Sequence, residues 1–168
     1  MRNSGLNSTS NNPADIALLH KAGERINKEI TDLDAVQNNM RKVGTANIVE
    51  IMDHFDLLPT HNFRYGSHPD TPKIDSSVWK ARFTQCLPDG CWLGCTMSCS
   101  HGVDDFPVET GPYAGKNVLV DGPEYENAAG LGANIGNFNP QVLLELNFYC
   151  DAHGVDTISF ANCVAFVM

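Results

Sequence analysis

The sequence predicts a mostly α-helical fold with long loops. Apolar residues recur at helical spacing in four segments, and two of these segments open with Asn-Pro, which is typical of a helix N-cap followed by a first-turn proline. The 168 residues suffice for one ordinary domain, and a 42% hydrophobic content suffices for a packed core. We therefore expect one helical domain or a part of one.

The first half of the chain contains two of these segments. Residues 1–12 are polar, and we expect them to form a flexible leader. A helix is predicted from Pro13 to about Leu33, with an apolar face over about five turns that should dock on another surface. A second helix is predicted from about Thr45 to Asp56. Its inward residues should be Ile48, Val49, Met52 and Phe55.

The other two segments lie near the end of the chain. Four prolines interrupt residues 59–90, so no long regular element is expected there, and residues 104–122 offer only a possible short strand at 117–120. A third helix should run from Pro140 to about His153, and a fourth should follow from about Asp156. The inward residues of the third should be Val142, Leu143, Leu146, Tyr149 and Cys150.

The charge distribution excludes some partners. The formal net charge is −9, and all of this imbalance lies in residues 83–168, where Lys116 is the single basic residue against ten acids. Because no cluster of cations is present, we expect binding neither to nucleic acid nor to an acidic membrane surface. The sequence also contains neither an apolar run of membrane-spanning length nor the apolar core of a signal peptide. The expected location is the cytoplasm.

Six cysteines in such a chain raise the question of metal binding, because a reducing compartment disfavours disulfides. Cys150 and Cys163 are isolated among apolar neighbours and are expected to be buried. The other four, which fall within fourteen residues and favour a metal site, are Cys86, Cys91, Cys95 and Cys99.

The spacing of these thiols favours an iron–sulfur cluster. Cys91, Cys95 and Cys99 recur every fourth residue, which on a helix or wound loop brings them to one side. Three close thiolates with one distant ligand are typical of a cubane cluster, whereas zinc usually takes two ligand pairs. Zinc and burial without a ligand remain alternatives, and Cys86 is either a fourth ligand or a bystander.

Several short motifs follow one another along the chain. They are Gly44-Thr-Ala, Leu58-Pro-Thr-His-Asn62-Phe63 with Gly66, Gly94-Cys95-Thr-Met-Ser-Cys99, Gly122-Pro-Glu124-Tyr-Glu126, Leu131-Gly-Ala-Asn134 and Asp151-Ala-His-Gly154-Val-Asp156. In this order and spacing they resemble the aldehyde:ferredoxin oxidoreductase family. These tungsten- or molybdenum-pterin enzymes also include the class II benzoyl-CoA reductase catalytic subunit.

The resemblance implies a fold, a set of cofactors and a set of site residues. Residues 13–168 would form an incomplete helical central domain of such an enzyme. A [4Fe–4S] cluster would be held by Cys91, Cys95 and Cys99, and a tungsten or molybdenum bis-pterin group would be contacted by Asp151, Gly154, Val155 and Asp156. Glu126, and not Glu124, would be the catalytic acid near the metal. From the residues alone, Asp156 could equally be only a helix cap.

The implied activity is the two-electron oxidation of a small aldehyde to a carboxylic acid. Electrons would leave through the cluster to ferredoxin or another electron-transfer subunit, and the full-length enzyme could be a homodimer. The alternatives are a benzoyl-CoA reductase-type subunit, an iron–sulfur electron-transfer module without catalysis of its own, and a nonfunctional fragment. The choice between tungsten and molybdenum stays open.

The sequence departs from the family pattern in two ways. Three residues separate Cys91 from Cys95, where the family usually has two. The family's β-rich pterin domain and its later DxxGLC motif are not in this sequence. We therefore expect that the chain alone binds no pterin, has marginal stability, and exposes both Asp151 and Asp156 and the apolar Ile158 to Phe166 face.

Overall fold

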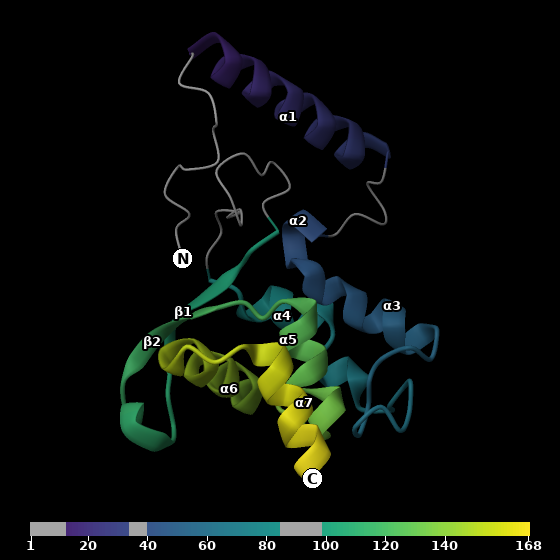
Figure 1. The fold of residues 1–168 in the computed structure, drawn as a ribbon, viewed down its shortest axis with the longest axis vertical. Coiled ribbons are helices and arrows are strands. Elements are labelled where there is room, and N and C mark those ends of the chain that lie inside the picture. The colour runs from purple at the N-terminus through teal and green to yellow at the C-terminus, as the bar shows by residue number, and fades with distance from the viewer. Residues whose placement is uncertain (1–12, 34–39, 85–98) are drawn as a thin grey trace.

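The computed structural model describes residues 13–33, 40–84 and 99–168, and it confirms a mostly helical fold (Figure 1). The helices in these ranges are α1 (Pro13–Leu33), α2 (Met40–Val43), α3 (Ile48–His54), α4 (Ser76–Arg82), α5 (Tyr125–Gly130), α6 (Pro140–His153) and α7 (Thr157–Val167). Two strands, β1 (Gly102–Pro107) and β2 (Asn117–Asp121), form an antiparallel pair. The predicted leader at 1–12 and the cysteines Cys86, Cys91 and Cys95 lie outside the described residues.

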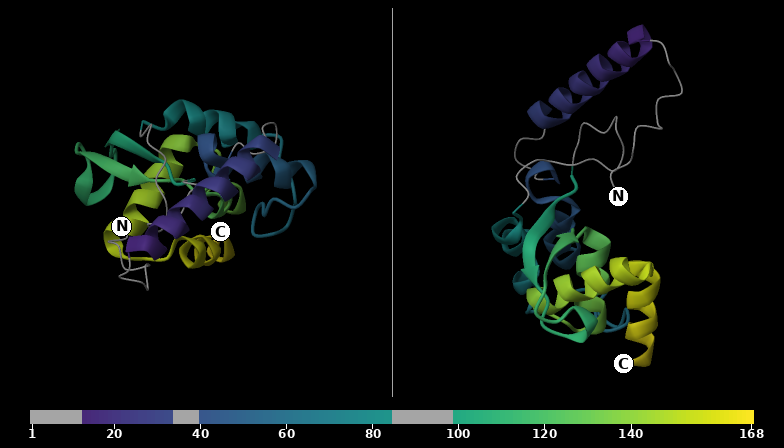
Figure 2. Two further views of the ribbon diagram at one scale, coloured as in Figure 1. Left: turned by 90° about the horizontal axis from the view of Figure 1, so that it is seen from above. Right: turned by 90° about the vertical axis from the view of Figure 1, so that its left-hand side faces the viewer.

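Helix α1 has the predicted bounds but not the predicted docking contact among the described elements. In Figure 1 and in the right panel of Figure 2 it lies away from the other helices. Its apolar residues Leu18 and Leu19 are 67% and 61% exposed. None of the helices in the described part of the chain is long and apolar enough to cross a membrane.

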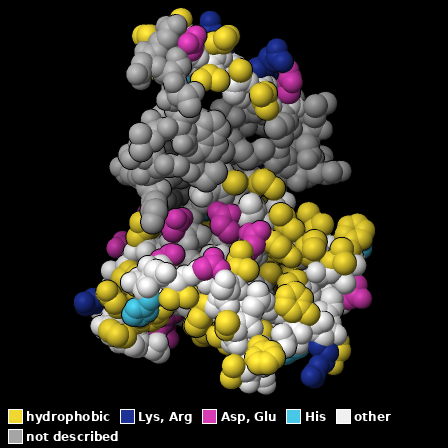
Figure 3. Space-filling view, viewed as in Figure 1, with side chains coloured by type: hydrophobic (Ala, Val, Ile, Leu, Met, Phe, Trp, Pro, Cys, Tyr) yellow, Lys and Arg dark blue, Asp and Glu magenta, His cyan; other side chains and the backbone are white. Residues whose placement is uncertain are grey.

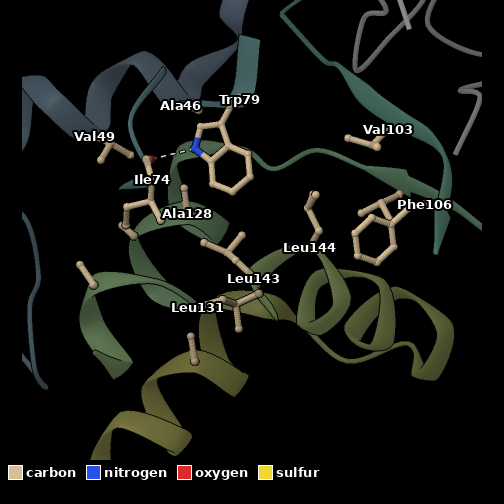
Figure 4. Packing of buried hydrophobic residues seen from close by; sticks show 14 of the residues in the cluster. Ala46, Val49, Ile74, Trp79, Val103, Phe106, Ala128, Leu131, Leu143 and Leu144 are labelled. Carbon is tan, nitrogen blue, oxygen red and sulfur yellow. Dashed lines mark hydrogen bonds between the residues drawn. The ribbon is translucent and has the colours of Figure 1, made fainter. Parts of the chain in front are cut away.

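The core lies where α3, α4, α5, α6 and the strand pair meet (Figure 4). Trp79 of α4 is fully buried there, and its indole N–H donates a hydrogen bond of 2.8 Å to the carbonyl of Ile74. That bond satisfies the one polar group that the buried indole carries. Leu131 after α5 and Leu143 and Leu144 of α6, all fully buried, complete this core.

Strand β1 was not predicted, and its bulge explains why. Val103 pairs with Val120 and Phe106 with Val118, so the register shifts between Val103 and Phe106. The two intervening residues are exposed aspartates, and Asp105 has a left-handed φ of 52°. Adjacent aspartates are unfavourable in a regular strand but are accommodated at a bulge. Strand β2 confirms the predicted strand and extends it by one residue.

Helices α4 and α5 were also not predicted. Helix α4 begins after Asp75, whose carboxylate accepts hydrogen bonds from the backbone N–H groups of Ser77 and Val78. An aspartate N-cap is a sequence signal from which the start of this helix could have been predicted. Helix α5 has no side-chain cap, since the Glu124 side chain does not bond to the first turn.

Some predicted burials are wrong. Cys163 is exposed on α7, whereas Cys150 is buried as predicted. Phe55 lies just beyond the end of α3 and is 66% exposed, and Val142 of α6 is 43% exposed. Helix α7 buries small residues, Ala161 and Ala165, because it packs closely on α5. Its larger residues at both ends, including Ile158 and Phe166, remain exposed as expected.

Glu145 of α6 fixes the loop that follows β1. Its carboxylate accepts hydrogen bonds from the backbone N–H groups of Glu109 (3.0 Å) and Thr110 (2.8 Å) and from the Thr110 hydroxyl. Burial by itself raises the pKa of Glu145, but these hydrogen bonds outweigh it and hold the pKa below the ordinary value of 4.5.

We expect Glu145→Gln to loosen this loop. The amide NH2 group of Gln would face a backbone donor, and each lost hydrogen bond is worth about 1 kcal/mol. Hydrogen exchange at residues 109 and 110, corrected for intrinsic rates, should rise at least about five-fold at pH 6. In the wild-type protein the same protection should be lost as pH falls below 4.5 and through the lowered folded-state pKa. Equal exchange in variant and wild type at pH 6 would contradict this role.

Candidate functional site

Three of the motifs, far apart in sequence, meet at the start of α5. The Thr45 hydroxyl donates a hydrogen bond to the Glu124 carboxylate and accepts one of 2.8 Å from the backbone N–H of Tyr125. The other carboxylate oxygen of Glu124 accepts a bond of 3.4 Å from the hydroxyl of Ser100, the residue after Cys99. The structure therefore joins the Gly44, Cys99 and Glu124 segments through side-chain hydrogen bonds.

Gly44 allows this close approach. Its φ is +69°, a left-handed conformation that favours glycine, and a Cβ atom there would lie 2.9 Å from the Cys99 carbonyl oxygen. The backbone of the Cys99 segment can therefore pack directly on the Gly44 turn. Cys99 itself is half-buried.

Glu124 is half-buried. Burial raises the pKa of its carboxyl, the hydrogen bonds from Thr45 and Ser100 oppose this rise, and the negative charges of Asp121 and Glu126 add to it. Glu124 therefore takes part in internal contacts with Thr45 and Ser100.

Glu126 has a different environment from Glu124. It lies in the first turn of α5, is exposed, and accepts no hydrogen bond from the described residues. It lines a small pocket of about 130 Å³ between α5, α7 and the turn at residues 59–63, together with Phe63 and Ile158. A larger open hollow of about 470 Å³ lies over residues 56–67 and contains none of the predicted site residues.

Two further motifs are paired on the other side of this pocket. The backbone N–H groups of His61 and Asn62 donate to the carbonyls of Ala133 (3.0 Å) and Asn134 (2.8 Å). The buried Asn134 side chain accepts from the backbone N–H of Phe63 at 3.2 Å. His61, Asn62 and Phe63 all have left-handed φ angles of 48–59°, which is unusual for residues other than glycine. These bonds hold the strained turn, and with it Phe63, in place beside Glu126.

The predicted pterin loop connects α6 to α7. Gly154 ends α6 in a left-handed conformation with φ of 66°, and the backbone N–H of Val155 donates to the Cys150 carbonyl at 2.8 Å. Asp156 is the N-cap of α7 and accepts from the Ser159 N–H at 2.8 Å, and these hydrogen bonds lower its pKa. Both Asp151 and Asp156 are exposed, as expected.

The surroundings of Asp151 disfavour its charged form, although the residue is exposed overall. Partial desolvation raises the pKa of its carboxyl, and the nearby negative charge of Asp121 raises this pKa further. The Thr157 hydroxyl, next to Asp156, donates a hydrogen bond of 3.1 Å to the Asn127 side chain of α5. The loop is therefore tied to the helix that carries Glu126.

The acceptor chemistry of this loop fits a pterin ring. An ionised carboxylate only accepts hydrogen bonds, and a pterin presents N–H and NH2 donors. The Asp151 carboxylate takes no hydrogen bond from the described residues, and one oxygen of Asp156 is engaged in capping. Of the three proposed cluster ligands, only Cys99 is among the described residues, which contain no group of three or more His, Cys, Asp or Glu side chains placed to hold a metal ion.

The surface over the strand pair and the start of α5 is acidic. In Figure 3, acidic side chains gather over the strands and the upper end of α5. This agrees with the charge imbalance of residues 83–168.

Sequence reasoning missed the polar residues that hold the motifs together. Thr45 and Asn134 lie inside quoted motifs, but nothing in the sequence indicates their partners, which are 79 and 71 residues away. Asn147 offered a signal, since it follows Leu143 by four residues on the inward face of a helix. A buried amide at that position requires hydrogen-bond partners.

Comparisons with known proteins agree with these motifs. Residues 21–168 match the family described as "Aldehyde ferredoxin oxidoreductase, domains 2 & 3". The chain is 30% identical over 145 residues to a tungsten-containing aldehyde ferredoxin oxidoreductase from Pyrococcus furiosus, and 31% identical to one from Thermococcus kodakarensis. Each alignment covers 86% of this chain and 22% of the relative.

A shorter similarity concerns a protein with a different substrate in its name. Over 73 residues the chain is 33% identical to the "Aliphatic sulfonate oxidoreductase, WOR-like subunit" of Pyrococcus furiosus, which covers 44% of this chain and 11% of that protein. The family match over residues 21–168 spans all of the sequence motifs from Gly44 to Asp156. The chain therefore belongs to the aldehyde ferredoxin oxidoreductase family.

Proposed function

We propose that this chain is the central helical part of a tungsten- or molybdenum-pterin oxidoreductase that oxidises an aldehyde to a carboxylic acid. The observation that carries the proposal is that one small helix, α5, with its N-cap Glu124, is hydrogen-bonded both to Ser100, the residue after Cys99, and to Thr157, the residue after Asp156. Two relatives with the same activity in their names support it. The reaction consumes water and releases two protons and two electrons, which pass singly to ferredoxin or a similar acceptor.

In this proposal, different residues of the chain bind the pterin and transfer the proton. When bound, the metal–pterin group supplies the two-electron chemistry. Asp151 and Asp156 would accept hydrogen bonds from the pterin ring and thereby orient it, and such bonds would favour the charged form of Asp151. Glu126, exposed beside a small pocket, takes a proton from water or substrate.

In this proposal, the segment that carries Cys99 contributes to electron transfer out of the site. Cys99, with Cys91 and Cys95, would ligate a [4Fe–4S] cluster, and the bond from Ser100, the residue after Cys99, to Glu124 at the start of α5 supports this. An electron-transfer module without catalysis would bind the cluster but no pterin. Pterin content therefore separates these two functions.

The proposal is tested by Glu126→Gln in the full-length, cofactor-loaded enzyme. We expect kcat to fall at least about a hundred-fold, because an amide cannot accept the proton, while metal and pterin content stay at the wild-type level. The matched control is Glu124→Gln, which keeps an acceptor for the Thr45 hydroxyl and should retain kcat within about three-fold. Near-normal turnover in Glu126→Gln would rule out the catalytic assignment.

The cluster assignment is tested by Cys95→Ala and Cys99→Ala. Each variant, purified without oxygen, should lose most of its iron and acid-labile sulfide, because a cubane cluster needs its thiolates. Cys163→Ala is the matched control, since Cys163 is exposed on α7 and should not affect iron content. Wild-type iron in both ligand variants would show that these cysteines do not bind the cluster.

A further inference from the structure

A chain of hydrogen bonds runs through the interior from α7 to the end of β2. The Thr157 hydroxyl donates to Asn127 Oδ1 at 3.1 Å, and Asn127 Nδ2 donates to Asn147 Oδ1. Asn147 Nδ2 in turn donates to the backbone carbonyl of Asp121 at 2.6 Å. We call these three side chains and the Asp121 carbonyl the amide relay.

The amide relay is directional. Each donor points from α7 toward β2, and each amide uses its oxygen on one side and its nitrogen on the other. Every link therefore depends on the orientation of its neighbour, as in a cooperative hydrogen-bond network. Losing the donor at one end removes the bond that orients the next amide.

Asn147 lies where packing alone would favour a leucine. It is fully buried on α6, one helical turn after the fully buried Leu143. Burying an amide is unfavourable unless its donor and acceptor are both satisfied. Its presence is therefore better explained by the segments that it joins than by a gain in core stability.

The two ends of the amide relay are each adjacent in sequence to a motif of the candidate site. Asp121 immediately precedes the Gly122 to Glu126 motif, which carries the proposed proton acceptor. Thr157 immediately follows Asp156, the N-cap of α7 and a proposed pterin contact. The Thr157 hydroxyl is not itself the cap, because Asp156 accepts the bond from Ser159.

We infer that Thr157, Asn127 and Asn147 are positioning residues that fix the loop of Asp151 and Asp156 relative to Glu126. Glu126 immediately precedes Asn127 on α5. The amide that accepts the hydrogen bond from the Thr157 hydroxyl is therefore next in sequence to the proposed catalytic acid. This role rests on the proposed function, because the position of the loop matters only if it holds a pterin. None of the three residues touches the reacting atoms in this account.

The test compares Thr157→Val with Thr157→Ser in the full-length, cofactor-loaded protein. Valine has nearly the shape of threonine without a donor, whereas serine retains the hydroxyl and is the matched control. We expect Thr157→Val to release pterin about five-fold faster than wild type, corresponding to the loss of one neutral hydrogen bond, and Thr157→Ser to stay within about two-fold. Pterin release is followed by fluorescence after dilution.

A second readout does not depend on the cofactor. Hydrogen exchange over residues 151–160, measured on the protein stripped of pterin, should be faster in Thr157→Val and unchanged in Thr157→Ser. If Thr157→Val lowers the thermal midpoint but leaves pterin release and this local exchange at wild-type values, the role is merely structural and the inference is wrong.

The outcomes separate this inference from the function on which it rests. A wild-type protein that contains no pterin overturns the proposed function, and the inference with it. A pterin-loaded wild type together with Thr157→Val that releases pterin at the wild-type rate overturns the inference alone.

Discussion

The Thr45 hydroxyl is the contact on which the arrangement of the site depends. By donating to Glu124 and accepting from the Tyr125 N–H, it holds the first turn of α5 against the Gly44 segment, while the Ser100 hydroxyl, next to Cys99, donates to the other oxygen of Glu124. Glu124 is engaged in these internal hydrogen bonds, whereas Glu126, in the first turn of α5, lines the pocket beside Phe63. The two carboxylates of one motif therefore have different environments.

The same helix organises the remaining motifs. Its far end leads into Asn134, whose side chain holds the strained turn of Phe63. The Asn127 side chain of α5 accepts a hydrogen bond from the Thr157 hydroxyl at the start of α7. A helix of six residues can do this because its neighbours are mostly small or polar, with Ala128 and Ala129 buried between them. The described parts of the family motifs are therefore connected in space, although the sequence separates them by up to more than 100 residues.

Much of the fold was predictable because local signals were strong. The caps and prolines at Pro13, Pro140 and Asp156 set three helix starts correctly. Where the outcome depended on tertiary contacts, prediction failed: the β1 bulge accommodates Asp104 and Asp105, and Cys163 is exposed because α7 packs through its alanines. The site motifs were predictable only as a family pattern. Their pairing depends on long-range hydrogen bonds, such as that from Thr45 to Glu124, which sequence spacing does not encode.

The central claim is that the loop between α6 and α7 is a pterin-binding surface and not only a helix connection. It is tested most directly by the pterin content of the full-length protein carrying both Asp151→Asn and Asp156→Asn. Asparagine caps a helix about as well as aspartate, so α7 should keep its start. Each charged carboxylate, however, becomes a neutral amide with one acceptor oxygen and an NH2 group that would face the pterin donors. We predict that pterin content per chain falls well below the wild-type value while hydrogen exchange at Ser159 stays unchanged. Full pterin content in the double variant would contradict the account.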